Sequence, residues 1–207
     1  MMRTTKSKTL QLTVLGFMTA LIFLFAFTPI GSIPIGPLVI TLNVIPVAIS
    51  AAALGPLGGA VAGGIFGLLS FLQCFGIGVP SAMGAVLVQI DPFLAFVQRF
   101  VPRLLDGFLA GLIFQAVRKH SNAYAACAVT GFCTAFLNTA FFMGTLVLLF
   151  GQTEYLQGLI GGRNILLFIC TFVGVNAVVE MAACTLVTGA IGSALYKARV
   201  LPEQSKG

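Results

Sequence analysis

A succession of long apolar blocks is the feature that most constrains how this chain can fold. A membrane-spanning helix needs about 20 predominantly apolar residues, and six blocks of about that length follow one another along the 207 residues. Charged residues make up 8% of the sequence, whereas soluble domains carry roughly 25%. The sequence therefore predicts an all-α integral membrane protein.

The blocks predict six transmembrane helices within one membrane domain. We place them at about 10–27, 38–55, 57–76, 91–117, 122–150 and 164–196. Gly55 and Pro56 lie at the junction of the second and third blocks, which predicts a tight turn at one membrane face. The last three blocks are longer than a bilayer requires, so we expect them to tilt or to project from it.

The positions of the basic residues predict the orientation. Six spans place both termini on the same side of the membrane. If that side is the cytoplasm, the inside segments hold eight of the eleven Lys and Arg residues, and the outside segments 28–37, 77–90 and 151–163 hold only Arg163. Since basic residues are enriched in cytoplasmic loops, we expect a multi-pass protein of the cell membrane with cytoplasmic N- and C-termini.

The first outside segment, 28–37, is rich in proline and glycine. Pro29, Pro34 and Pro37 cannot donate a backbone hydrogen bond, and Gly31 and Gly36 allow unusual backbone angles. A helix is therefore not expected here. Two interpretations remain: a plain connecting loop, or a lid over a polar site.

Polar side chains lie in the outer half of five of the predicted helices. They are Asn43, Gln73, Arg99, Asn138 and Asn176. A polar group buried without a partner costs several kcal/mol, so these groups pair with one another, with water or with a ligand. Hydrogen bonds between helices are the alternative for the amides. The Arg99 guanidinium stays charged and matches a carboxylate, which favours an acidic ligand.

Further charged residues lie deeper in the predicted bundle. Arg99, Arg103 and Asp106 share one helix face, and Asn176 and Glu180 share another. We expect Arg103 to form a structural ion pair with Asp106 or Glu180, which leaves Arg99 for the ligand.

Catalytic and metal-binding patterns are absent from the sequence. The single His120 follows Arg118 and Lys119 in an inside loop, and the five cysteines form no CxxC pair. No Walker sequence occurs. We therefore predict neither an enzyme nor a cofactor or metal site, and active transport would need ATPases on another polypeptide.

The first predicted helix carries two small residues, Gly16 and Ala20, four positions apart. Small residues at this spacing let another helix approach closely. The approaching helix belongs either to this chain or to a partner membrane subunit.

The chain resembles the substrate-binding S components of energy-coupling factor (ECF) vitamin transporters. The stretches IPIGPLVITLNVIPVAI and LGPLGGAVAGGIFGLLSFLQCFG resemble the second and third helices of one S-component group, and LNTAFFMGTLVLL resembles its fifth. The resemblance covers about residues 10–197 and implies a six-helix bundle that captures a vitamin from outside. It also implies that residues 28–37 form a lid, and that Gly16 and Ala20 dock on a transmembrane coupling subunit (T component) driven by two ATP-binding-cassette ATPases.

The resemblance further implies that the ligand lies between helices four to six and the outer loops. The candidate substrate-binding residues are Thr41, Asn43, Phe71, Gln73, Phe96, Arg99, Asn138 and Asn176. The pattern is most similar to the pantothenate type, whose carboxylate would bind Arg99. Folate, biotin, niacin and hydroxymethylpyrimidine remain alternative ligands, and a self-sufficient secondary transporter or channel remains an alternative function.

Overall fold

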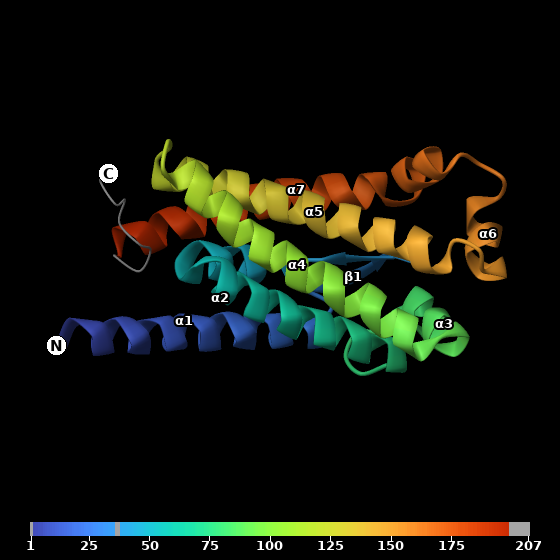
Figure 1. The fold of residues 1–207 in the computed structure, drawn as a ribbon, viewed down its shortest axis with the longest axis horizontal. Coiled ribbons are helices and arrows are strands. Elements are labelled where there is room, and N and C mark those ends of the chain that lie inside the picture. The colour runs from blue at the N-terminus through green and yellow to red at the C-terminus, as the bar shows by residue number, and fades with distance from the viewer. Residues whose placement is uncertain (1, 36–37, 199–207) are drawn as a thin grey trace.

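A computed structural model describes residues 2–35 and 38–198 of the chain, which form a helical bundle and one short β-hairpin (Figure 1). The elements, in order, are α1 (Met2–Phe27), β1 (Ser32–Ile35), β2 (Leu38–Thr41), α2 (Val44–Leu72), the 3-10 turn η1 (Gln73–Phe75), α3 (Ala82–Ile90), α4 (Pro92–Arg118), α5 (Ala123–Phe150), α6 (Glu154–Ile160) and α7 (Ile165–Lys197).

Five helices in the described part of the chain are long and apolar enough to cross a membrane. These candidate spans are Lys8–Phe27, Val44–Phe75, Pro92–Arg118, Ala123–Phe150 and Asn176–Lys197. They support a multi-pass membrane protein, but their number differs from the six spans that the sequence predicted. The all-α fold class is confirmed, and one short two-stranded sheet of β1 and β2 accompanies the helices in the described residues.

The difference in span number comes from residues 38–76. Residues 38–41 form β2 rather than the start of a helix, and α2 contains a non-helical residue, Gly55 (φ 76°, ψ −167°). A Cβ built on Gly59 would lie 2.8 Å from the Cβ of Ala51, although the two positions are about 12 Å apart along a continuous helix. The chain therefore reverses at Gly55, where the sequence predicted a turn.

The reversal divides α2 into two arms, 44–54 and 56–72. The first arm is about 16 Å long at 1.5 Å per residue, about half of the roughly 30 Å hydrocarbon core. The prediction of a full helical span over 38–55 is therefore wrong, because its first third is strand and loop.

The second arm of α2 packs closely on α4. A Cβ on Gly59 would overlap the carbonyl oxygen of Gly107, and a Cβ on Gly63 would overlap the carbonyl oxygen of Arg103. Only glycine permits such close backbone contact between membrane helices. This packing places the arginines of α4 beside Phe66, whose ring centre lies 5.4 Å from the Arg103 guanidinium carbon.

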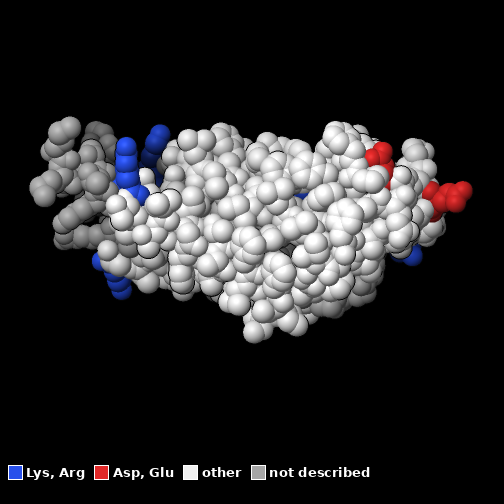
Figure 2. All heavy atoms as spheres, turned by 90° about the horizontal axis from the view of Figure 1, so that it is seen from below, with Lys and Arg blue, Asp and Glu red and all other residues white. Residues whose placement is uncertain are grey.

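The remaining helices complete the bundle. α5 packs against both α4 and α7, whereas α1 packs mainly against α2. The start of α1 and the end of α7 lie at the same end of the molecule (Figure 1). Lys and Arg side chains gather at that end and acidic side chains at the opposite end (Figure 2).

The β-hairpin, β1 and β2, takes the place of the expected loop. Its strands are antiparallel, with Ser32 opposite Thr41, and Leu42 N donates to the Gly31 carbonyl over 2.9 Å. β1 contacts α1 and β2 contacts α7. Gly36 and Pro37, the last residues of the expected lid 28–37, lie outside the described residues.

Candidate ligand-binding site

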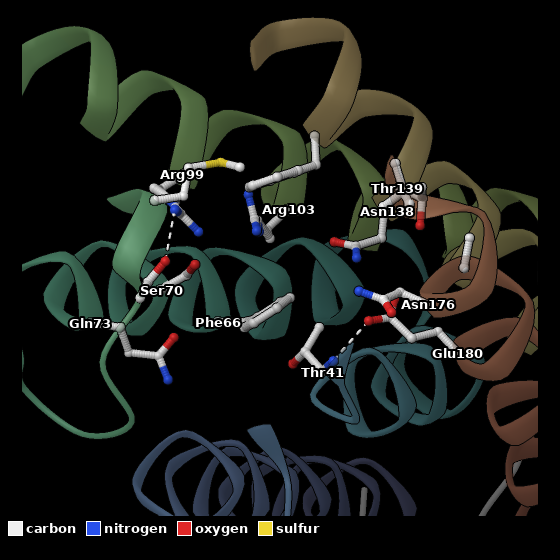
Figure 3. A pocket seen from close by; sticks show the side chains of 15 residues that line it. Thr41, Phe66, Ser70, Gln73, Arg99, Arg103, Asn138, Thr139, Asn176 and Glu180 are labelled. Carbon is white, nitrogen blue, oxygen red and sulfur yellow. Dashed lines mark hydrogen bonds between the residues drawn. The ribbon is translucent and has the colours of Figure 1, made fainter. Parts of the chain in front are cut away.

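A cavity lies between α2, α4, α5 and α7 and is bordered by β2 and by the start of α3 (Figure 3). Its polar lining comprises Thr41, Ser70, Gln73, Ser81, Arg99, Arg103, Asn138, Thr139, Asn176 and Glu180, and its apolar lining comprises Phe66, Met83, Phe142, Val173 and Ala177. Polar groups from elements far apart in the sequence therefore converge on one space. In the described ranges, no three His, Cys, Asp or Glu side chains are grouped as metal ligands.

The structure brings five of the sequence-predicted binding residues together. Thr41, Gln73, Arg99, Asn138 and Asn176 all line the cavity. They come from β2, η1, α4, α5 and α7 in turn. The rise of a helix placed Gln73, Arg99, Asn138 and Asn176 in the outer half of the predicted spans, and the bundle turns them toward the same interior.

Three other predicted binding residues do not line the cavity. Asn43 is buried at the start of α2, and its backbone N–H donates to Thr41 Oγ1 over 3.3 Å. Phe71 and Phe96 pack edge to face, with ring centres 5.2 Å apart. These two rings fill the contact between α2 and α4, so they are helix-packing residues in this structure.

Arg99 is buried at the side of the cavity nearest α3. Its Nη2 donates to Ser81 Oγ over 3.1 Å, and its guanidinium carbon lies 5.1 Å from the centre of the Phe142 ring. Ser81 caps α3 by accepting from Gly84 N. A Cβ on Gly84 would lie 2.9 Å from Arg99 Nη2, so glycine at this position leaves room for the guanidinium.

Arg103 lies one helical turn further along α4. Pro102 has no N–H for the carbonyl of Gln98, which lies four residues earlier, and Arg103 Nη1 donates to that carbonyl instead, over 3.2 Å. The guanidinium carbon of Arg103 lies 4.4 Å from the centre of the Phe142 ring. The proline thus contributes to the position of Arg103 at the cavity wall.

The predicted ion pair of Arg103 with Asp106 or Glu180 is not formed in this structure. Among the described residues, Asp106 Oδ1 accepts no hydrogen bond, and Glu180 Oε1 accepts from Thr41 N over 2.7 Å. A guanidinium has five N–H donors, and Nε of both Arg99 and Arg103 has no partner in the described part of the chain. Two buried cations therefore lie along the same wall, each with an unbonded Nε among the described residues.

The opposite side of the cavity carries hydrogen-bond acceptors. Asn138, Asn176, Glu180 and Thr41 lie together there, across from the two arginines (Figure 3). Asn138 Oδ1 has no hydrogen-bond partner within the described residues. The cavity is therefore suited to a small molecule with a carboxylate at one end and hydroxyl or amide groups at the other.

Several residues that line or position the cavity wall were not among the predicted binding residues, although the sequence carries a signal for each. Phe142 follows Asn138 at i+4, so it lies on the same face of α5. Ser81 follows a proline and begins a helix, which is the position where a serine caps. Pro102 in the middle of an apolar helix also marks a local departure from regular bonding, next to Arg103.

Tyr155 of α6 lies outside the candidate spans and is influenced electrostatically by Arg99. Burial raises the pKa of its phenol above the ordinary value, while the charge of Arg99 lowers it to a smaller extent. The phenol is therefore neutral at pH 7 and keeps its proton as a hydrogen-bond donor.

Comparison with known proteins assigns the chain to a family. Residues 10–192 match the family of ECF transporter substrate-specific components. The chain belongs to this family. It is also 30% identical over 200 residues to the pantothenate transporter PanT of Leuconostoc mesenteroides subsp. mesenteroides, a match that covers 91% of this chain and 93% of that protein.

The family match identifies the chain as the substrate-specific component of a membrane transporter. The matched range includes every residue that lines the cavity, from Thr41 to Glu180. The two buried arginines and the acceptors opposite them thus lie within the part of the chain that matches the S-component family.

Proposed function

We propose that this S component captures pantothenate from outside the cell for an ECF importer. The observation that carries the proposal is the pair of buried arginines, Arg99 and Arg103, which lie on one wall of the cavity with no acidic partner within 4.0 Å in the described residues. A buried cation without a partner is costly, and a carboxylate ligand would supply one. The name of the Leuconostoc relative supports pantothenate among the acidic vitamins.

The chemistry of pantothenate suits both sides of the cavity. Its carboxylate would lie against the guanidinium groups, and its amide and hydroxyl groups would reach Asn138, Asn176 and Glu180. Its dimethyl carbon would pack on apolar lining such as Phe66 and Phe142. Folate, biotin and niacin also carry carboxylates and stay alternatives, whereas hydroxymethylpyrimidine offers no anion to the arginines.

We propose that both termini face the cytoplasm and that the β-hairpin is the lid. The gathering of Lys and Arg at the end that holds the start of α1 and the end of α7 supports this orientation (Figure 2). The start of α3 and β2, which border the cavity, would then face the outside. The segment that begins at residue 28 and continues into the β-hairpin would open and close over the ligand, with β1 and β2 moving together.

We propose that α1 docks on a T component, which two ATP-binding-cassette ATPases drive. Gly16 and Ala20 are exposed, and a Cβ on Gly16 would meet nothing within 4 Å. The buried side of α1 is instead formed by Met18, Ile22 and Ala26. The small residues are therefore open to another polypeptide, which supports the partner over a helix of the same chain.

Reconstitution tests the proposed function. The purified chain alone is expected to bind pantothenate without transporting it, and ATP-dependent uptake into vesicles is expected only when the T component and the ATPases are added. Uptake of pantothenate by the chain alone would favour the secondary-transporter or channel alternative. Failure to bind pantothenate, with tight binding of another vitamin, would replace the ligand and keep the transporter function.

A further inference from the structure

Glu180 is a buried carboxylate that bonds to the lid rather than to a cation. Its side chain is 6% exposed, and Oε1 accepts a hydrogen bond from the backbone N–H of Thr41 over 2.7 Å. No Lys or Arg nitrogen of the described residues lies within 4.0 Å of it. Hydrogen bonds to a charged acceptor are stronger than neutral ones, and more so in a buried site.

The hydrogen bond between Thr41 N and Glu180 Oε1 can fix the position of both strands of the β-hairpin. Thr41 ends β2 and lies opposite Ser32 of β1, and the next residue, Leu42, donates to the Gly31 carbonyl. A force on Thr41 is therefore shared by both strands at the base of the β-hairpin. The Glu180 carboxylate ties that base to α7.

The same carboxylate also faces the cavity. Glu180 and Asn176 lie one helical turn apart on α7, across from Arg103 (Figure 3). A carboxylate has about four lone-pair sites, and the bond from Thr41 uses one of them. Acceptor capacity is thus left for a hydroxyl donor on a ligand.

We propose that Glu180 couples ligand binding to closure of the lid. One oxygen holds the base of the β-hairpin on α7, and the carboxylate also accepts a hydrogen bond from the hydroxyl end of the ligand. A bound ligand then fixes the Glu180 side chain in the position that Thr41 needs. The contact between Glu180 and a ligand hydroxyl rests on the proposed function. The bond between Glu180 and Thr41 does not, because it joins two groups of the chain itself.

Glu180→Gln keeps the size of the side chain and removes its charge. We expect pantothenate to dissociate roughly 10-fold to 100-fold faster from this variant, because a charge-assisted hydrogen bond is replaced by a neutral one. The association rate is expected to change little. An analogue of pantothenate without hydroxyl groups is expected to lose less on the same substitution. Asp106→Asn is the matched control, because it removes a buried carboxylate that does not line the cavity.

Hydrogen exchange of a peptide covering residues 38–43 supplies a second readout that needs no ligand. In Glu180→Gln this peptide is expected to exchange faster than in the wild type, while Asp106→Asn leaves it unchanged. If exchange stays as slow as in the wild type, the bond does not hold the lid and the proposal is overturned.

The wild type could fail to bind pantothenate while residues 38–43 still exchange faster in Glu180→Gln. That combination would refute pantothenate as the ligand and leave the bond between Glu180 and the lid in place. Faster exchange with an unchanged dissociation rate for pantothenate would overturn the coupling of the lid to the ligand.

Discussion

Removal of the Arg103 guanidinium should weaken the binding of a carboxylate far more than that of its neutral analogue. We choose Arg103→Met, which keeps an unbranched apolar stem beside Phe66 and Phe142. The side chain is 5% exposed, so its charge is poorly screened by water. Removal of one partner of a buried, hydrogen-bonded charge pair costs about 2–5 kcal/mol. At about 1.4 kcal/mol per factor of ten, pantothenate affinity should fall about 30-fold to 4,000-fold.

Part of the cost of Arg103→Met falls on stability rather than on binding. The hydrogen bond to the Gln98 carbonyl is lost, and Pro102 cannot replace it. A hydrogen bond that involves a charged group contributes roughly 1.5–3 kcal/mol to folding. That loss is the same for every ligand, so it cancels when two ligands are compared on one variant.

The assay is titration of the purified chain with pantothenate and with its alcohol analogue, in which the carboxylate is replaced. The wild type is expected to prefer pantothenate strongly, and Arg103→Met to lose most of that preference. Arg163→Met is the matched control, because it removes an exposed cation outside the cavity. Equal weakening of both ligands by Arg103→Met would refute a carboxylate contact at this arginine.

Three further substitutions test other parts of the account. Gly84→Ala should weaken pantothenate binding about tenfold, because the new Cβ would lie 2.9 Å from Arg99 Nη2; unchanged affinity in a titration would show that Arg99 does not need this space. Gly16→Leu should leave ligand binding intact and abolish uptake by the reconstituted transporter. Gly144→Leu is the control at another open glycine position and should leave both binding and uptake intact. Loss of ligand binding in Gly16→Leu would contradict a pure docking role. Gly55→Ala should lower the free energy of unfolding by about 1–3 kcal/mol, because its backbone angles are restricted to glycine; an unshifted thermal melt would contradict the reversal there.

The long helices were predictable because the membrane imposes a strong pattern on sequence. Apolar blocks at 91–117, 122–150 and 164–196 correspond to α4, α5 and α7. A lipid environment requires every backbone group to be bonded within the span, so length and hydropathy locate such helices well. Residues 38–41 were not predictable in this way, because a short apolar strand and the start of a helix have the same composition.

The candidate site was predictable where depth alone decides which groups meet. Arg99, Asn138 and Asn176 lie at similar depths on neighbouring helices, and the cavity joins them. Depth does not fix the direction in which a side chain points around its helix. Phe71 and Phe96 therefore pack on each other, although each lies close in sequence to a residue that lines the cavity.

The partner of a buried charge was harder to predict than its position. The sequence predicted Asp106 or Glu180 as the ion-pair partner of Arg103. In the structure, Glu180 instead accepts a hydrogen bond from the backbone N–H of Thr41, on a strand far away in the sequence. Such a contact depends on where the β-hairpin lies relative to α7, which no local pattern in the sequence records. The result is a cavity with two arginines rather than one.

Titration calorimetry of the purified chain against a panel of vitamins, with pantothenate first, decides whether the two arginines bind a carboxylate ligand. We predict tight one-to-one binding of pantothenate that is lost in Arg99→Ala and strongly reduced in Arg103→Met. An absence of binding to any carboxylate vitamin by the intact, folded chain would contradict the claim that the two arginines form an anion-binding wall.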